Sequence, residues 1–206
     1  MIAALTGSGL AAAAGLNAWI PFVLVAMIAR FTELIDLPSD YDWVTSEWAL
    51  GVGVLLLLTE IVVDKVPVVD HVNDLVQTAV RPTVGGLISS ATFSAQNLDN
   101  SQWMRDNPWA GAIIGVAVAG LTHATKSAAR PVINVGTAGF GAPVASTIED
   151  VLSVVVSVLA IFAPIVILVV LVIMAWVMVR IWRRWAAWRA RRQSPGLPKT
   201  QELPTG

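Results

Sequence analysis

The chain has 206 residues, of which 56% are hydrophobic and only 13% are charged, and its mean hydropathy is +0.71. Soluble domains carry about 25% charged residues, so this composition argues against a soluble protein and predicts an integral membrane protein. The chain has no cysteine, which excludes disulfides, thiolate metal sites and cysteine nucleophiles. The formal net charge of −1 hides a strong segregation of charge along the chain.

The first apolar stretch, Ile2 to Ala29, has no basic region ahead of it. We therefore expect it to stay as a first membrane span, since a cleaved secretory signal begins with basic residues. Three further stretches are apolar enough to cross a bilayer: Trp48 to Val63, Trp109 to Ala124, and Val151 to Val179. Four spans alone would place Lys126 and Arg130 outside, against the rule that basic residues collect on the cytoplasmic side.

Two weaker segments supply the missing crossings. Thr83 to Ala95 and Asn134 to Thr147 are short and rich in Gly, Ser, Thr and Ala, and each either crosses or re-enters. The prediction is an all-α integral membrane protein with about six membrane elements in three hairpins, whose membrane domain covers residues 1–179. Its cytoplasmic side receives most basic residues, and its outer side receives the acidic ones: Glu33, Asp36, Asp40, Asp42, Glu47, Asp99, Asp106, Glu149 and Asp150.

Glycines recur at the start of three segments that leave the cytoplasmic side in this arrangement. Small residues let helices approach closely, which is the packing interpretation. Glycine-interrupted segments at corresponding positions also mark the binding sites of transporters, because broken helices expose backbone groups to a solute. The sequence leaves both interpretations open for Gly7, Gly9, Gly85, Gly86, Gly136 and Gly139.

Charged residues occur within two of the predicted spans, although a charge at the centre of a membrane helix costs roughly 2.5 to 3.5 kcal/mol. Glu60 and Asp64 share a helix face, with Lys65 next to them. The second set shares a face of the span that follows Trp109, and it consists of His123, Lys126 and Arg130. The two sets lie at the same depth, so an ion pair such as Glu60 with Lys126 fixes helix register or belongs to a transport site.

Residues 66–82 alternate apolar and polar positions with the period of an amphipathic helix, which predicts a helix on the cytoplasmic surface. Asp70 and Asp74 share one face of this helix, and His71 lies beside them. These side chains could hold a divalent cation. Their spacing matches no established metal motif, so no cofactor is expected and the metal is kept as an alternative.

Six of the 13 basic residues lie in residues 180–193, where a tryptophan recurs every three residues. This pattern predicts a juxtamembrane helix beneath anionic lipid headgroups, or an ordinary stop-transfer anchor. Residues 194–206 are polar and rich in Pro and Gly, which predicts a disordered tail. The expected location is the bacterial plasma membrane with both termini cytoplasmic, and the expected partners are lipid and further copies of the chain, without nucleic acid.

Four segments, "GLNAWIPFVLV", "EIVVDKVPVVDHVNDLVQTAVRPTVGG", "HATKSAARP" and "STIEDVLSVV", resemble a family of small bacterial integral membrane proteins numbered 4126 among the domains of unknown function. The resemblance covers most of residues 5–165 and implies membrane placement without implying an activity. The positions that match its polar motifs are Asn17, Glu60, Asp64, Lys65, Asp70, His71, Arg81, His123, Lys126, Arg130, Glu149 and Asp150.

These features favour a small transporter or channel-like protein that moves a small solute, an ion or an anionic lipid. The expected ion-binding residues are Glu60, Asp64, Lys65, His123, Lys126 and Arg130, and the expected anion-binding residues are Arg81, Lys126 and Arg130. The motifs of serine hydrolases, zinc proteases and P-loop enzymes do not occur, which lowers the expectation of an enzyme. The alternatives are a metal-dependent hydrolase or transferase acting on a lipid headgroup, and an accessory subunit of a membrane complex.

Overall fold

The computed structural model describes residues 1–65, 67–136 and 141–193, excluding the side chains of 67–72, 74, 130–136, 142, 185 and 187–193. The predicted tail, 194–206, and Gly139 lie outside the described residues. The described residues form helices joined by loops, without a strand. Its elements are α1 (Ile2–Leu16), α2 (Trp19–Phe31), η1 (Ser39–Thr45), α3 (Glu47–Val63), α4 (Pro67–Phe93), α5 (Gln102–Asp106), α6 (Pro108–Gly136), α7 (Gly141–Phe162) and α8 (Pro164–Gln193).

The predicted all-α membrane class is confirmed. Among the described residues, three segments are long and apolar enough to cross a membrane: Pro108–Ala129, Pro143–Phe162 and Pro164–Arg184. Helix α3 joins this group when it is taken together with η1, from which it is bent by 57°. Helices α1 and α2 are apolar but shorter.

The first apolar stretch forms two helices that return to the same end of the molecule, where it was predicted to cross once. Asn97 donates to the Glu33 carbonyl at 2.6 Å and accepts from the Asp36 amide at 2.9 Å. The amine of Met1 pairs with Asp99 in the same loop and lowers the pKa of that carboxyl by its hydrogen bond. Both ends of the α1–α2 pair therefore meet this loop, so residues 2–31 form a helical hairpin in place of the single predicted helix.

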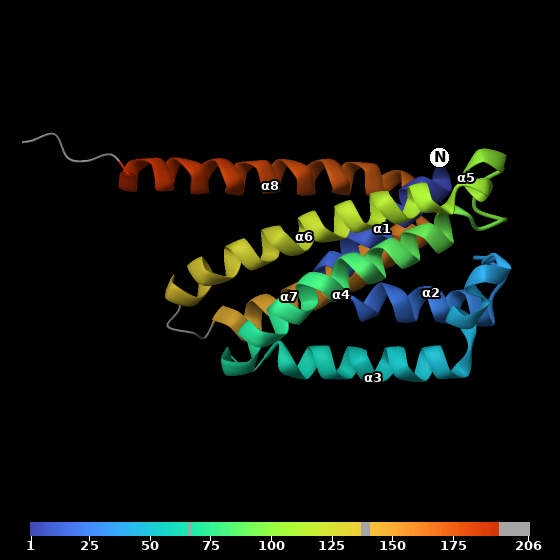
Figure 1. Cartoon of the computed structure of the whole chain (residues 1–206), viewed down its shortest axis with the longest axis horizontal. Coiled ribbons are helices and arrows are strands. Elements are labelled where there is room, and N and C mark those ends of the chain that lie inside the picture. The colour runs from blue at the N-terminus through green and yellow to red at the C-terminus, as the bar shows by residue number, and fades with distance from the viewer. Residues whose placement is uncertain (66, 137–140, 194–206) are drawn as a thin grey trace, which may run out of the picture.

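Helices α1 and α2 are each shorter than the apolar core of a bilayer is thick. They have 15 and 13 residues, which corresponds to about 22 Å and about 20 Å of helix. The apolar core of a bilayer is about 30 Å thick. In Figure 1, Met1 and the described end of α8 lie at opposite ends of the molecule.

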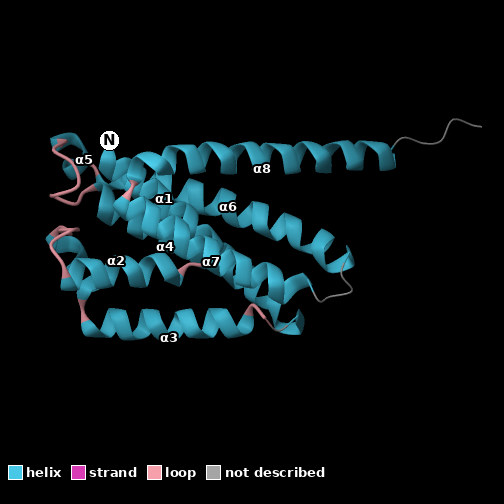
Figure 2. Ribbon diagram, turned by 180° about the vertical axis from the view of Figure 1, so that it is seen from behind, coloured by secondary structure: helices cyan, strands magenta, loops and turns pink. Residues whose placement is uncertain are grey.

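The predicted final span, Val151 to Val179, is interrupted at Ala163. Pro164 has no N–H and disfavours helical geometry in the residue before it, so one helix ends there and the next begins. Helix α8 then turns back along α7 (Figures 1 and 2). Glu149 and Asp150, predicted in an outer loop, consequently lie within α7. The predicted element Asn134 to Thr147 is divided between the end of α6, residues 137–140, which are not described, and the start of α7.

Helix α4 is one continuous helix of 27 residues in place of the two elements predicted at 66–82 and 83–95. Gln77 and Arg81 are buried within it, with exposed fractions of 5% and 0%. Leu75, on another face, is 76% exposed. This part of α4 therefore packs its polar face inward against the protein and turns apolar side chains outward.

Glycines let α1, α4 and α6 pack closely. A Cβ added at Gly86 would lie 2.6 Å from Val116, and one at Gly9 would lie 2.8 Å from Ala160. Gly7 and Gly85 are similarly close to side chains of neighbouring helices. The four glycines lie inside continuous helices, which supports the packing interpretation for them, while the surroundings of Gly136 are not described.

Candidate functional site: a buried ion network at a helix break

The site begins at the break between α1 and α2, where Asn17 is fully buried. Its Oδ1 accepts from the amides of Trp19 at 3.1 Å and Ile20 at 3.2 Å, which caps the start of α2. Pro21 explains why the helix breaks here, because it has no N–H to bond the Asn17 carbonyl four residues earlier and its ring would clash with that carbonyl. Asn17 and Pro21 together are the sequence signal that could have predicted the break.

The last carbonyl groups of α1 accept hydrogen bonds from basic side chains of other helices. Arg81 Nη1 donates to the Gly15 carbonyl at 3.3 Å, and Lys126 Nζ donates to the Leu16 carbonyl at 3.0 Å. Ser153 donates to the Ala13 carbonyl at 3.0 Å. The end of a helix carries partial negative charge, so cations are favourable there.

The same two cations connect three carboxylates. Arg81 Nη2 lies 2.7 Å from Glu60 Oε1 and 3.5 Å from Asp64 Oδ2. Lys126 Nζ lies 3.3 Å from Asp64 Oδ2 and 2.8 Å from Glu149 Oε2. We call the five residues the charge chain, in which the signs alternate in the order Glu60, Arg81, Asp64, Lys126 and Glu149. Each cation is shared by two carboxylates, so removal of one carboxylate leaves its cation another partner.

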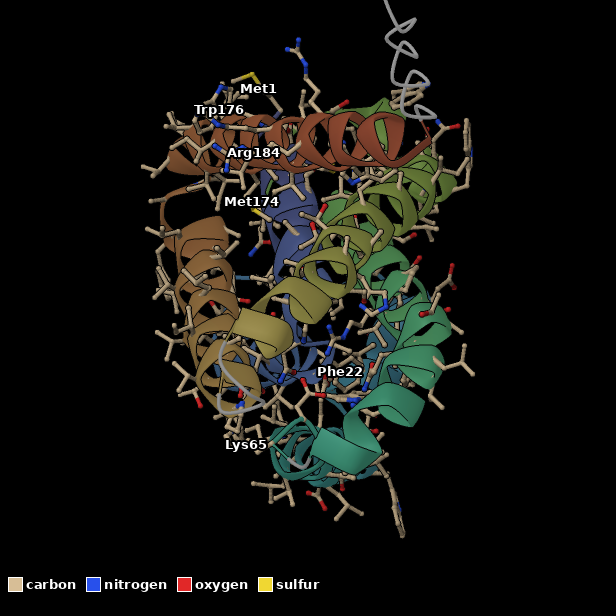
Figure 3. The ribbon with its side chains drawn as sticks, turned by 90° about the vertical axis from the view of Figure 1, so that its left-hand side faces the viewer. Met1, Phe22, Lys65, Met174, Trp176 and Arg184 are labelled. Carbon is tan, nitrogen blue, oxygen red and sulfur yellow. The ribbon has the colours of Figure 1, made fainter. Side chains whose placement is uncertain are left out.

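Asp150, beside the charge chain on α7, connects the helix break to the end of α3. Its Oδ1 accepts from Asn17 Nδ2 at 2.9 Å, and its Oδ2 lies 3.4 Å from Lys65 Nζ. Lys65 is about one-third exposed, and Figure 3 shows it on the far side of the bundle from α8. The polar groups therefore extend from a fully buried interior toward the surface near Lys65.

His123 adjoins Arg81 inside the bundle. Its Nδ1 lies 3.3 Å from Arg81 Nη1, and its Nε2 lies 3.1 Å from the Thr78 hydroxyl. A guanidinium can only donate, so Nδ1 accepts and the ring proton sits on Nε2, facing Thr78. A neutral His123 that orients Arg81 satisfies this geometry.

The structure brings most of the predicted ion-binding residues into one place: Glu60, Asp64, Lys65, His123 and Lys126. It differs in their pairing, because Glu60 contacts Arg81, and Lys126 contacts Asp64 and Glu149. Glu149 and Asp150 belong to the site although the predicted arrangement placed them outside. The pairing of α7 with α1 decides this, and hydropathy alone does not reveal it.

Four predicted site residues have side chains that lie outside the described part of the structure: Asp70, His71, Asp74 and Arg130. Within the described part, no three His, Asp or Glu side chains lie together in a group that could hold a metal ion. The predicted metal site falls on the first three of those residues.

Three buried polar atoms near Arg81 have no hydrogen-bond partner among the described residues: Glu60 Oε2, Gln77 Oε1 and Arg81 Nε. Gln77 lies one turn before Arg81 on α4, and Glu60 contacts Arg81 directly. Buried polar atoms normally have partners, and a strained contact, a bound water or ion, or a functional role accounts for the exceptions. The Glu60 end of the charge chain therefore retains hydrogen-bonding capacity that its protein neighbours do not use.

Comparison with curated proteins and with solved structures gave no match. Comparison with family models gave one that covers residues 4–184, which include every residue of the charge chain. Its description is "Domain of unknown function (DUF4126)", and the chain belongs to this family.

Proposed function

We propose that the protein is a small membrane transporter or channel-like protein, in which the charge chain and the adjoining helix break form the site for a small charged solute. One observation carries the proposal: an apolar helix pair breaks inside the bundle at the position where buried charges converge. Broken helices expose backbone groups at mid-depth in transporters, where these groups bind ions and substrates. Ionisable groups within membrane segments commonly mark such pathways.

The geometry favours a cation over an anion as the solute. Arg81 and Lys126, predicted to bind an anion, each contact two carboxylates. An anion would have to displace those carboxylates and would also face the negative end of α1. A cation would instead use the carboxylates and the terminal carbonyls of α1, which are already arranged to accept donors.

The proposal is tested by flux measurements on purified protein in liposomes, with three probes: protons followed by an internal pH-sensitive dye, rubidium ion and radiolabelled methylammonium. Glu60→Gln is expected to abolish the flux, while insertion and thermal stability are retained because Arg81 keeps Asp64 as a partner. The matched control is Glu47→Gln on the same helix, whose side chain is 86% exposed. Equal flux in wild type and Glu60→Gln contradicts a role for Glu60, and lack of wild-type flux with all probes contradicts transport.

The proposal includes anionic lipids as partners of α8. A shallow hollow on this helix is lined by Trp176, Val179, Arg180, Arg183 and Arg184. The Arg180 guanidinium lies 5.1 Å from the centre of the Trp176 ring. Figure 3 shows Trp176 and Arg184 together there. Basic residues beside an apolar span attract anionic headgroups. We therefore assign this end of α8 to the cytoplasmic face of a bacterial plasma membrane.

The lipid proposal is tested by binding to vesicles of phosphatidylglycerol and of phosphatidylcholine. The variant Arg183→Gln/Arg184→Gln is expected to lose the preference for phosphatidylglycerol, with Arg105→Gln in α5, away from the basic end of α8, as the control. An unchanged preference would contradict the assignment of α8.

An accessory subunit is the second candidate, and the exposure of α8 favours it. Only 6% of the residues in the apolar segment of α8 are buried, against 33% in that of α7. A surface of this kind faces lipid, a further copy of the chain or another membrane protein. If α8 docks a partner protein, ending the chain after Val179 should release a co-purifying protein, whereas a transporter that acts alone should keep its flux.

A further inference from the structure

The ammonium group of Lys126 occupies a site built by three other segments of the chain. Its Nζ lies 3.0 Å from the Leu16 carbonyl, 3.3 Å from Asp64 Oδ2 and 2.8 Å from Glu149 Oε2. These acceptors come from the end of α1, the turn after α3, and α7. We call them the ammonium cage.

The chemistry of the cage matches a primary ammonium group. Such a group has three N–H donors and no acceptor, and the cage supplies three oxygen acceptors. The distances of 2.8 to 3.3 Å are those of hydrogen bonds from nitrogen to oxygen. Magnesium and calcium bind oxygen at about 2.0 to 2.6 Å, so the cage as arranged is too wide for a divalent metal ion.

The charges of the cage also suit a monovalent cation. Two of its oxygens belong to carboxylates and the third belongs to a helix terminus with partial negative charge. Asp64 additionally accepts from Arg81 and from Asn73, at 3.5 Å and 2.7 Å, so its carboxylate stays held when Lys126 moves. The cage therefore keeps a framework and a negative charge that do not depend on Lys126.

We propose that the ammonium cage is a binding site for free ammonium or a small primary amine, with Lys126 as a tethered occupant that such a cation displaces. The inference that ammonium or a primary amine is the transported solute rests on the proposed transport function. As a binding site, it stands on the geometry of the cage alone.

The burial of the cage indicates a route for exchange. Asp64 and Lys126 have side chains that are each 2% exposed, whereas the Glu149 side chain is 15% exposed. Glu149 is therefore the wall nearest the surface. A cation entering past Glu149 meets that carboxylate first and then competes with Lys126 for Asp64.

The test removes the ammonium group of Lys126 by substitution and adds free ammonium or amine salts to the variants. Lys126→Ala vacates the whole side chain, whereas Lys126→Met removes the charge and retains a stem of similar length. Thermal unfolding of each detergent-purified variant is measured in ammonium, methylammonium, potassium and tetramethylammonium chlorides at equal ionic strength. A ligand that binds only the folded protein raises its unfolding temperature.

We expect ammonium to stabilise both variants and methylammonium to stabilise Lys126→Ala more than Lys126→Met, because the methyl group needs the vacated space. Potassium lacks N–H donors and tetramethylammonium is too large, so both should stabilise less. The matched control is Lys65→Ala, which removes a partly exposed lysine beside the charge chain and should show no preference for ammonium.

Equal effects of ammonium and potassium on the Lys126 variants would overturn the inference, as would equal preferences in the Lys65 control. Both variants are also prepared with ammonium chloride present throughout. Folded protein recovered only with ammonium supports the cage, and variants that stay unfolded there contradict it.

Methylammonium flux separates this inference from the transport proposal. Stabilisation by ammonium without wild-type flux would confirm the cage and remove the transport proposal. Flux that is lost in Glu60→Gln, combined with no stabilisation of the Lys126 variants, would support transport and overturn the cage.

Discussion

Helices α1 and α8 are both strongly apolar, yet their surroundings are opposite. Helix α1 is rich in Gly and Ala and buries ten of its residues, while α8 carries large aliphatic residues and leaves most of them exposed. Lipid is as apolar as leucine, so hydrophobicity alone does not draw a helix into a membrane protein. Small side chains favour a central position because they allow helices to pack closely. Residue size therefore distinguishes the central helix α1 from the exposed helix α8.

The ends of the two helices differ in the same way. Helix α1 ends inside the bundle, where its carbonyls bind Arg81 and Lys126. Helix α8 continues past the apolar region into a basic segment, beyond the other helices (Figure 2). An internal helix end needs polar partners from the protein, because no solvent reaches it. The charge chain therefore stabilises the break in addition to any role in binding.

The largest expected effect on the free energy of unfolding comes from removing Arg81. This cation contacts Glu60 in α3 and Asp64 in the turn that follows. Arg81→Ala leaves Glu60 and Asp64 buried with one fewer positive charge, and loss of one partner from a buried ion pair costs about 3 to 5 kcal/mol. Arg30→Ala should cost about 0 to 1 kcal/mol, because Glu47, the partner of Arg30, is highly exposed. Chemical unfolding in mixed micelles gives both values, and similar losses would show that the charge chain adds nothing special.

A second comparison replaces one leucine in α1 and one in α8. Leu10→Ala in α1 creates a cavity at a fully buried position and should cost about 2 to 5 kcal/mol. Leu168→Ala in α8 changes a side chain that is 55% exposed, and it should stay within about 0.5 kcal/mol. The same unfolding assay applies, and a large loss for Leu168→Ala would indicate that α8 is buried against another protein chain.

The smallest expected effect on the free energy of unfolding comes from adding a methyl group at a glycine between two packed helices. A Cβ at Gly15 would lie 2.5 Å from Thr122 and 2.6 Å from the Ala119 carbonyl, whereas one at Gly51 meets nothing within 4 Å. Gly15→Ala should therefore cost about 1 to 3 kcal/mol through overpacking. Gly51→Ala should be neutral or stabilising by up to about 1 kcal/mol, since alanine favours helix. Tolerance of Gly15→Ala would show that α1 and α6 can move apart.

Several features of the site could be predicted from residue spacing. Glu60 and Asp64 were predicted on one helix face and His123 and Lys126 on another, and the structure brings the two faces together through Arg81 and through the contact of Lys126 with Asp64. The break between α1 and α2 was missed because the run from Ile2 to Ala29 has the length and hydropathy of one span. Asn17 followed by Pro21 was the available signal for the break.

The sequence by itself determined the membrane class, the helical content and the set of charged residues that gather in the interior, because composition and helical periodicity are local properties. Only the tertiary structure decided the partners: Arg81 between Glu60 and Asp64, and Lys126 among Leu16, Asp64 and Glu149. These contacts join residues far apart in the chain, and they depend on how closely α1 packs against α4, α6 and α7. A shift of one helical turn would give each cation a different carboxylate while leaving every local pattern unchanged.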